Sequence, residues 1–302
     1  MRLEVKGDVF ASASPAAAPG QTRPVLPAVT VDDPDDPRLA DFVGLTDAAL
    51  RRRHELGAGI FIAEGTLVIR QVVARGARLR SLLVTESRLA ALDTVAASTD
   101  APVYLATRDL MRRVAGFDLH RGAVAAVERP APRDPAVLVA GARRVLVLED
   151  INDTENMGAL IRNAAGLGAD AVLLSPRCCD PFYRRAVRVS MGHVMTVPIA
   201  TLQPWPGALD VVRASGFTVA ALSPGGEIPL ERAGLASAAR LALLVGAEGA
   251  GLSGAASDRA DVRVRIAMSP WVDSLNVASA AAIALHASRP AQEPPEPATV
   301  ET

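Results

Sequence analysis

Short apolar runs alternate with stretches of helical periodicity through most of the chain. In the first half, the apolar runs predict strands at 59–63, 81–85, 103–106 and 123–127. The periodic stretches between them predict helices at 67–75, 88–97 and 107–114. Strands and helices in alternation are typical of a small α/β layer.

The second half repeats the alternation with longer apolar runs. These runs predict strands at 145–148, 171–174, 217–221, 241–245 and 262–266. Helices are predicted between and after them, at 157–166, 183–191, 207–214 and 277–287. A continuous apolar run is typical of a parallel strand that is buried on both faces. We therefore expect a mostly parallel sheet with helices on both sides.

The length of 302 residues, with 50% of them hydrophobic, suits two domains with substantial cores. Residues 1–37 are rich in Ala, Pro, Ser and Asp, and the stretch from 289 is rich in Pro and Glu, which is typical of disordered segments. Prolines at 130, 132 and 135 mark a linker. The predicted organisation is a disordered leader at 1–37, a first domain at 38–130, a linker at 131–140, a second domain at 141–288 and a disordered tail at 289–302.

The net charge of −1 argues against a basic domain that coats nucleic acid, although one segment has a local excess of positive charge. Residues 50–88 hold eight arginines and three acids, including Arg51, Arg52 and Arg53. This excess predicts either contacts with backbone phosphates or solvated helix faces. Aromatic residues make up only 3% of the chain, which argues against a sheet that stacks bases on exposed rings.

The two cysteines, Cys178 and Cys179, exclude a disulfide framework and a four-ligand zinc site, so we expect packed thiols and no metal. The apolar stretches fall short of the roughly 18 residues that a membrane helix needs. No apolar region follows Arg2 and Lys6, so no secretory signal is predicted. We expect a cytoplasmic protein with no membrane partner.

The stretch 156–164 follows the strand that ends at Glu149 and Asp150. Asn156 can cap the helix that begins there, and Gly158 allows another backbone or a substrate to come close. Arg162 lies on the same side of that helix as Gly158, four residues later. An ordinary cap followed by a surface arginine is the alternative interpretation.

The stretch 244–253 takes a buried strand into a turn that contains Gly246, Glu248, Gly249 and Gly251. A turn at the carboxyl end of a strand suits close approach of the backbone to a ligand. The alternative is a tight turn with no ligand. The glycine spacing matches neither the dinucleotide fingerprint nor the phosphate-binding P-loop.

The stretch 266–277 takes the last strand into an Ala-rich helix. Ile266 and Met268 follow the strand, and Ser274 and Asn276 open the helix. Such residues can cap a helix, and the free N–H groups there attract anions. Plain capping is the alternative for this stretch taken alone, but three such stretches at three strand ends of one sheet predict a site.

Together the three stretches resemble motifs 1, 2 and 3 of the SpoU/TrmH family, in the SPOUT class of RNA 2′-O-ribose methyltransferases. The matching residues are Asn156-x-Gly158-Ala159-x-x-Arg162-Asn163-Ala164, Gly246-x-Glu248-Gly249-x-Gly251-Leu252, and Ile266-x-Met268 with Ser274-Leu275-Asn276-Val277. The segment 180–192 resembles the stretch between motifs 1 and 2. The resemblance covers about 145–287, and the unit before it resembles the L30e-like substrate-binding domain of many members.

The resemblance implies a SPOUT-type parallel sheet with a deep trefoil knot, S-adenosylmethionine bound between the motif 2 and motif 3 loops, and a homodimer whose sites share residues. It implies a cofactor-binding set of Gly246, Gly249, Ile266, Met268 and Leu275. It implies a catalytic set of Arg162, Asn156, Glu248, Ser274 and Asn276. Two positions depart from the family pattern: Ala267 stands where Pro is usual, and Pro270 where Gly is frequent.

The implied reaction moves the methyl group of S-adenosylmethionine to a ribose 2′-hydroxyl, and we expect ribosomal RNA as the substrate. Arginine stays charged near neutral pH, so Arg162 would hold a phosphate and stabilise the developing alkoxide, with phosphate or water as the proton acceptor. Ser274 would bind phosphate at the helix start. The alternatives are the same reaction on transfer RNA and a catalytically weak RNA-binding member of the family.

A Rossmann-type oxidoreductase or methyltransferase is a further alternative. It predicts a glycine fingerprint directly after the first strand of the second unit and an acid about 20 residues later. The chain reads Glu149-Asp150-Ile151-Asn152-Asp153 there and has no glycine until Gly158. The pattern therefore disfavours this class.

Overall fold

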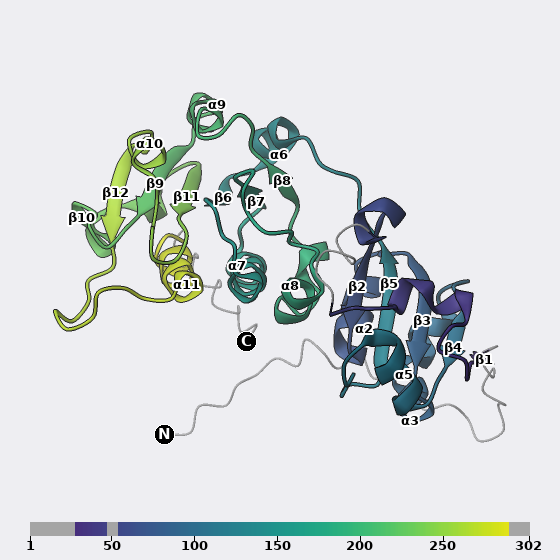
Figure 1. Cartoon of the computed structure of the whole chain (residues 1–302). Helices are drawn as coiled ribbons and strands as arrows, with labels where there is room; N and C mark the ends of the chain where they lie inside the picture. The colour runs from purple at the N-terminus through teal and green to yellow at the C-terminus, as the bar shows by residue number, and fades with distance from the viewer. Residues whose placement is uncertain (1–27, 47–53, 290–302) are drawn as a thin grey trace, which may run out of the picture.

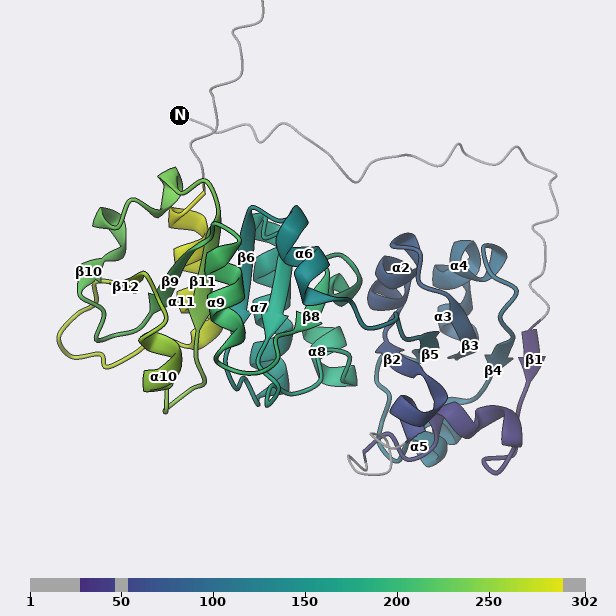
Figure 2. The ribbon, with the colours of Figure 1, turned by 90° about the horizontal axis from the view of Figure 1, so that it is seen from above.

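The computed structural model describes residues 28–46 and 54–289 (Figure 1). It shows two α/β lobes side by side, connected by the segment before α6 (Pro135–Gly141) (Figure 2). The predictions for residues 1–27, for Arg51 to Arg53 and for 290–302 lie outside the described residues. Within the described ranges, no helix is long and apolar enough to cross a membrane.

The first lobe is built on a mixed sheet. Its strands are β1 (Ala28–Thr30), β2 (Ile60–Glu64), β3 (Leu79–Val84), β4 (Val103–Leu105) and β5 (Ala123–Glu128). In the described part of the chain these five strands have the order β1-β4-β3-β5-β2. β4 pairs in parallel with β1 and β3, whereas β5 pairs antiparallel with β3 and β2.

Helices cover both faces of this sheet because side chains alternate along its strands. Ile60 and Ile62 of β2 face η1 (Pro37–Phe42) and α5 (Arg108–Ala115). Phe61 and Ala63 face the opposite side, where they join α2 (Thr66–Ala74), α4 (Asp93–Ala97) and the short turns α3 (Glu86–Leu89) and η2 (Ala90–Leu92) that precede α4. All four strands and all three helical stretches predicted here are present, with small changes of boundary.

Two segments of the first lobe differ from the prediction. Residues 28–30 form β1 inside the predicted disordered leader, and Val31 beside it is 3% exposed. A short β-branched run pairs with β4, and the Pro/Asp-rich composition around it concealed this run. α6 begins inside the predicted linker because Asp134 caps it and Pro135 occupies its first turn, where proline is compatible with a helix.

The second lobe contains the parallel sheet that the apolar runs predict. Its strands are β6 (Arg144–Leu148), β7 (Ala171–Leu174), β8 (Ile199–Thr201), β9 (Thr218–Leu222), β10 (Ile228–Pro229), β11 (Leu241–Val245) and β12 (Val262–Arg265). Among the described residues these seven strands run in parallel in the order β10-β12-β9-β11-β6-β7-β8. The sequence did not predict β8 and β10, which are the two short edge strands.

Alternate residues of the central strand β6 face opposite helical layers. Leu146 and Leu148 pack with α7 (Thr154–Leu167), α8 (Arg184–Val189) and α11 (Val277–Ala287). Val145 and Val147 pack with α6, α9 (Ala208–Ala214) and α10 (Gly254–Ser257). This two-sided burial explains why the strand reads as an unbroken apolar run.

The strand order brings three chain segments to one edge of this sheet. β11 lies between β9 and β6, so the carboxyl ends of β9, β11 and β12 are close together. The chain must then pass from β12 to α11, which packs beside α7. In open parallel sheets, ligands bind outside carboxyl strand ends at such a switch in strand order.

The two lobes share one continuous apolar cluster. The rings of Phe61 in β2 and Phe182 before α8 lie 5.3 Å apart between centroids. Beside them, Arg184 donates a hydrogen bond of 2.6 Å to Glu64, and Arg129 binds Asp180. Because Phe61 and Phe182 both belong to the cluster, each lobe depends on the other to cover it.

Candidate active site

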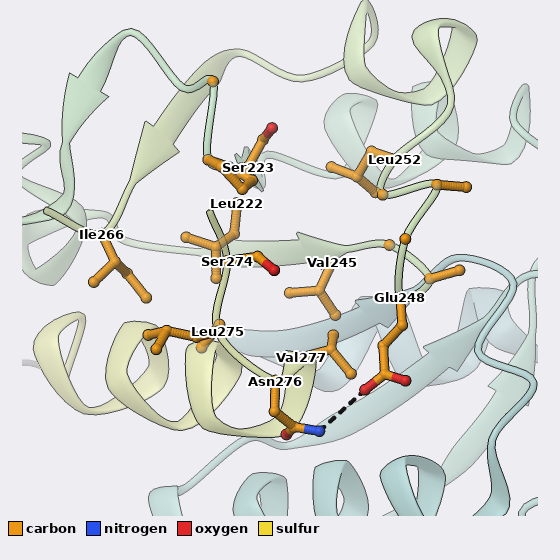
Figure 3. Close-up of a pocket in the computed structure, with 18 of the residues that line it drawn as sticks. Leu222, Ser223, Val245, Glu248, Leu252, Ile266, Ser274, Leu275, Asn276 and Val277 are labelled. Carbon is orange, nitrogen blue, oxygen red and sulfur yellow. Dashed lines mark hydrogen bonds between the residues drawn. The ribbon is translucent and has the colours of Figure 1, made fainter. Parts of the chain in front are cut away.

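A cavity of about 540 Å³ lies at the carboxyl ends of β9, β11 and β12 (Figure 3). This volume is within the usual range for small-molecule sites. Its walls come from four segments, which are 222–225 at the end of β9, 245–252 at the end of β11, Ile266 with Met268 after β12, and 274–277 with Ala280 at the start of α11. The second and third sequence motifs therefore line one cavity, together with a segment after β9.

The chemical character of this cavity favours an uncharged or cationic ligand. Its walls are mostly apolar side chains and glycine-rich backbone, and Leu222, Val245 and Leu275 point into it (Figure 3). Among the described residues that line it, Glu248 is the one ionisable group. No lysine or arginine of the described residues lines it, so it offers no positively charged side chain to a diphosphate.

Three polar side chains, one from each motif, meet at this cavity. The Asn156 amide donates to Glu248 Oε1 over 2.5 Å. The Asn276 amide donates to the same oxygen over 3.0 Å and to Asn156 Oδ1 over 2.8 Å. The sequence places Asn156 and Glu248 92 residues apart, and only the parallel sheet brings them together.

The start of α11 fixes the orientation of Asn276. Its side-chain oxygen accepts from the backbone N–H groups of Ala278 and Ser279, so its amide nitrogen must face Glu248. Of the two capping candidates in the sequence, Ser274 and Asn276, it is Asn276 that caps α11. Ser274 lies two residues before the cap, and its hydroxyl points into the cavity (Figure 3).

The start of α7 corrects the predicted role of Asn156 as a cap. Asp153 is the cap, since its carboxylate accepts from the N–H groups of Glu155 and Asn156. The helix thus begins earlier than predicted, at Thr154. This earlier start frees the Asn156 side chain to join Glu248 and Asn276.

Arg162 lies on α7 but does not line the cavity of its own chain. The backbone of α8 covers Gly158, because a Cβ there would lie 2.6 Å from the carbonyl oxygen of Ala186. Arg162, one turn later on the same side, is exposed. Its charge acts on His193 in η3 (His193–Met195), whose pKa is lowered by burial and then by the charges of Arg75 and Arg162.

In the glycine loop 246–252 the two limbs of the backbone lie in close contact, which the sequence did not predict. A Cβ on Gly246 would lie 2.3 Å from the backbone of Gly251, and Ala247 forms a bridge with Gly251. The close approach at Gly246 is thus made by the other limb of the same loop. Gly249 and Gly251 have φ angles of 77° and 67°, which favour glycine.

Glu149 was missed as a functional candidate. This carboxylate is 2% exposed at the end of β6, and it accepts from the Trp205 indole over 2.7 Å. It also accepts from the Ser253 hydroxyl over 2.7 Å and the Ser253 N–H over 2.8 Å, which anchors the far end of the glycine loop. The sequence feature that could have indicated Glu149 is an acid directly after an apolar run. In the same way, the Ser-Pro-Gly sequence at 223–225 follows a predicted strand and could have indicated a segment that lines the cavity.

The cysteines do not provide a nucleophile. Burial raises the pKa of the Cys178 thiol, and it raises the pKa of the Cys179 thiol to about 12, so both stay protonated near neutral pH. Across the residues that the structure describes, no group of His, Cys, Asp and Glu side chains could hold a metal ion.

Comparisons with known proteins agree with the motifs. The profile of the SpoU rRNA methylase family matches residues 143–286. An uncharacterized tRNA/rRNA methyltransferase of Mycobacterium tuberculosis is 49% identical over 259 residues, which cover 85% of this chain and 90% of the relative. The 23S rRNA (guanosine(2553)-2′-O)-methyltransferase RlmP of Bacillus subtilis is 26% identical over 78% of this chain and 90% of its own length.

A solved structure extends this similarity to the fold. The SpoU methyltransferase AviRb of Streptomyces viridochromogenes, solved in complex with AdoMet, has a TM-score of 0.69 and 25% identity over 84% of this chain and 97% of its own. The α/β class and the parallel-rich sheet of the prediction are confirmed by this likeness. The chain thus belongs to the SpoU rRNA methylase family, and it is an RNA methyltransferase that uses S-adenosylmethionine.

Proposed function

We propose that the protein transfers the methyl group of S-adenosylmethionine to a ribose 2′-hydroxyl of ribosomal RNA. The contact between Asn156, Glu248 and Asn276 beside the cavity carries this proposal, because it joins all three motifs in one site. The relative from Bacillus subtilis carries out this reaction on 23S rRNA, which favours ribosomal over transfer RNA. An enzyme with this substrate would work in the cytoplasm.

The residues that line the cavity fit S-adenosylmethionine. The backbone at Gly246, Ile266 and Leu275 would hold the adenosine, with Gly249 and Met268 closing around it. Glu248, the lone ionisable group of the lining within the described residues, suits a ligand with a positive sulfonium. The bound cofactor supplies an already activated methyl group.

The residues of the chain then have to position the ribose and ease the proton from its hydroxyl. Ser274 would bind the phosphate beside the target, and Asn156, Glu248 and Asn276 would hold the ribose in line for displacement. Arg162 stays positive and would stabilise the developing alkoxide, with the neighbouring phosphate or water as the proton acceptor.

We propose that the enzyme is a homodimer in which Arg162 of the partner subunit completes each site. Within one chain, Arg162 lies outside the cavity lining, on the α8 side of α7, so a site of one chain lacks it. An exposed arginine with no ion pair among the described residues remains available to another chain.

A mixing experiment tests this arrangement. Arg162→Ala and Asn276→Ala proteins should each be nearly inactive, with turnover reduced roughly 10²–10³-fold. When equal amounts are unfolded together and refolded, each mixed dimer would contain one complete site, so about a quarter of wild-type activity should return. No recovery would place Arg162 in the site of its own chain.

The substrate is tested by methylation with tritiated S-adenosylmethionine. Ribosomal RNA and transfer RNA from cells that lack the enzyme are incubated separately, and the labelled nucleosides are separated after digestion. We expect label in a 2′-O-methyl nucleoside of ribosomal RNA. Label on a base, or in transfer RNA alone, would contradict the proposal.

We also propose that residues 38–130 form an L30e-like RNA-binding domain and that 141–288 form the methyltransferase domain with a trefoil knot. The knot is supported by the position of α11, which packs against α7 and β11 although it follows β12, on the other side of β9. RNA capture by the first domain is supported by its exposed arginines. Because the two lobes share the Phe61–Phe182 contact, substitution of these arginines is a cleaner test than deletion of the domain.

A further inference from the structure

Trp271 is the most exposed large apolar side chain in the described part of the chain, with 91% of its surface accessible. The other aromatic rings in the described ranges are buried or half-buried. Trp205, for example, donates its indole N–H to Glu149 inside the fold. A ring that projects fully into solvent presents both of its faces to a ligand that can stack on it.

The position of Trp271 relates this ring to the active site. It lies in the segment 266–276 between β12 and α11, which extends beyond the body of the second lobe (Figure 1). Met268 on one side of it and Ser274 on the other both line the cavity. A backbone hydrogen bond of 3.1 Å from Val272 to Ser269 forms a turn that carries the ring. Both ends of the segment thus reach the cavity, and a nucleotide that enters through an opening on this side would pass the ring.

The composition of this segment indicates what the ring can bind. Residues 266–277 contain no lysine or arginine, and Asp273 is their single charge, so the segment cannot hold phosphate by ion pairing. An indole face can stack on any nucleobase, and such stacking needs no charge. A base next to the target nucleotide meets that requirement, because the target ribose itself must enter at this edge.

We propose that Trp271 stacks on a nucleobase that flanks the target nucleotide and thereby positions the ribose at the cavity. This inference rests on the proposed function, since it assumes that RNA enters at this opening. The ring sets the distance between the stacked base and the cofactor, and so contributes to the choice of the nucleotide that is methylated. Trp271 is a positioning residue, and its contribution to RNA affinity does not depend on the salt concentration.

The test uses full-length protein saturated with S-adenosylhomocysteine and two probes, a twelve-nucleotide oligoadenylate and an abasic ribose-phosphate chain of equal length. Trp271→Ala should weaken oligoadenylate binding about tenfold, whereas Trp271→Phe should retain most of it. Affinity for the abasic chain and the dependence on salt should not change. Val211→Ala, an exposed apolar position on α9, is the matched control and should bind as the wild type does.

Fluorescence gives a second readout. The chain has two tryptophans, so the difference between wild-type and Trp271→Phe emission isolates the signal of Trp271. Oligoadenylate should quench that difference signal, and the abasic chain should not. The proposal would be overturned by equal affinities of wild type and Trp271→Ala for oligoadenylate.

Three other outcomes separate this inference from the function on which it rests. If Trp271→Ala lowers the stability of a dimer in sedimentation experiments but leaves oligoadenylate binding unchanged, the ring is a subunit contact and the inference is wrong. If the wild type methylates RNA and Trp271→Ala does so with the same KM, the inference fails while the proposed function stands. If the wild type binds neither RNA probe at low salt and methylates no RNA, both fail.

Discussion

The two loops that frame the cavity are held in very different ways. The loop 246–253 is bridged to itself at Ala247 and Gly251, and its end is tied to the buried carboxylate of Glu149. Within the loop 266–276, a backbone hydrogen bond from Val272 to Ser269 forms one turn, and this turn exposes Trp271 to solvent. One loop is anchored, and the other is open.

This difference matches two kinds of ligand. A small cofactor has a fixed shape, so a rigid loop can be complementary to it before it binds. A large RNA must enter, be aligned and leave, which suits a loop with few internal restraints. The two ends of the open loop, Ile266 with Met268 and 274–276, line the cofactor cavity together with the anchored loop. We infer that the anchored loop and these two ends serve the cofactor and that the exposed turn 269–273 serves the RNA, and the following substitutions test that division.

The largest effect is expected at Gly246. A side chain in Gly246→Val would overlap the backbone of Gly251, so the loop must open and cofactor binding should be lost. Gly254→Ala, where a Cβ meets nothing within 4 Å, is the control and should bind normally. Calorimetric titration with S-adenosylmethionine, after circular dichroism has confirmed folding, checks both. An unchanged dissociation constant in Gly246→Val would remove this loop from the cofactor site.

A smaller loss is expected at Glu149. Glu149→Gln replaces one carboxylate oxygen by an NH2 group, which then faces either the Ser253 N–H or the Trp205 indole and the Ser253 hydroxyl. A buried donor left without an acceptor costs about 1–3 kcal/mol. The affinity for S-adenosylmethionine should fall about tenfold or more. Ser253→Ala should weaken it less, and the double variant should be no worse than Glu149→Gln alone. Fully additive losses would show that the two residues act separately.

The open loop lacks basic residues, so the charge that attracts RNA must lie elsewhere. Arg70, Arg75 and Arg88 of the first lobe are exposed and have no ion pair within the described residues, whereas Arg78 pairs with Glu128. Replacing the three exposed arginines with glutamine should lower the slope of log affinity against log salt by about 2, at ~0.7 per lost contact on single strands. An unchanged slope would mean that these arginines only solvate helix faces.

The smallest effect is expected at Pro270 in the open loop. Pro270→Ala frees the backbone next to Trp271, which costs roughly 0.4–1 kcal/mol of ordering. RNA affinity should fall about two- to fivefold, and S-adenosylmethionine affinity should stay the same. Filter binding and calorimetry measure the two constants. A large loss of cofactor affinity would show that this loop is as rigid as the other.

Much of the fold could be predicted from the sequence because its central strands are continuous apolar runs. The edge strands β1, β8 and β10 escaped prediction because each has two or three residues and depends on its neighbour for pairing. The meeting of the motifs was predictable as well, since parallel strands bring their carboxyl ends together.

The parts of the site that could not be predicted depend on packing between distant segments. The direction of Arg162 follows from α8 covering the Gly158 side of α7, which helical spacing alone does not reveal. The role of Glu149 depends on Trp205 and Ser253, which lie 56 and 104 residues further along the chain. The tight turn at Gly246 is a contact within its own loop, where the sequence suggested a ligand.

A crossed pair of titrations tests the division between the loops most directly. S-adenosylmethionine and oligoadenylate are each titrated into wild type, Glu149→Gln and Trp271→Ala. We expect Glu149→Gln to weaken the cofactor about tenfold and to leave the RNA within about twofold. Trp271→Ala should show the reverse pattern. If each variant weakens both ligands to a similar degree, the two loops act as one unit, which contradicts the division between cofactor and RNA binding.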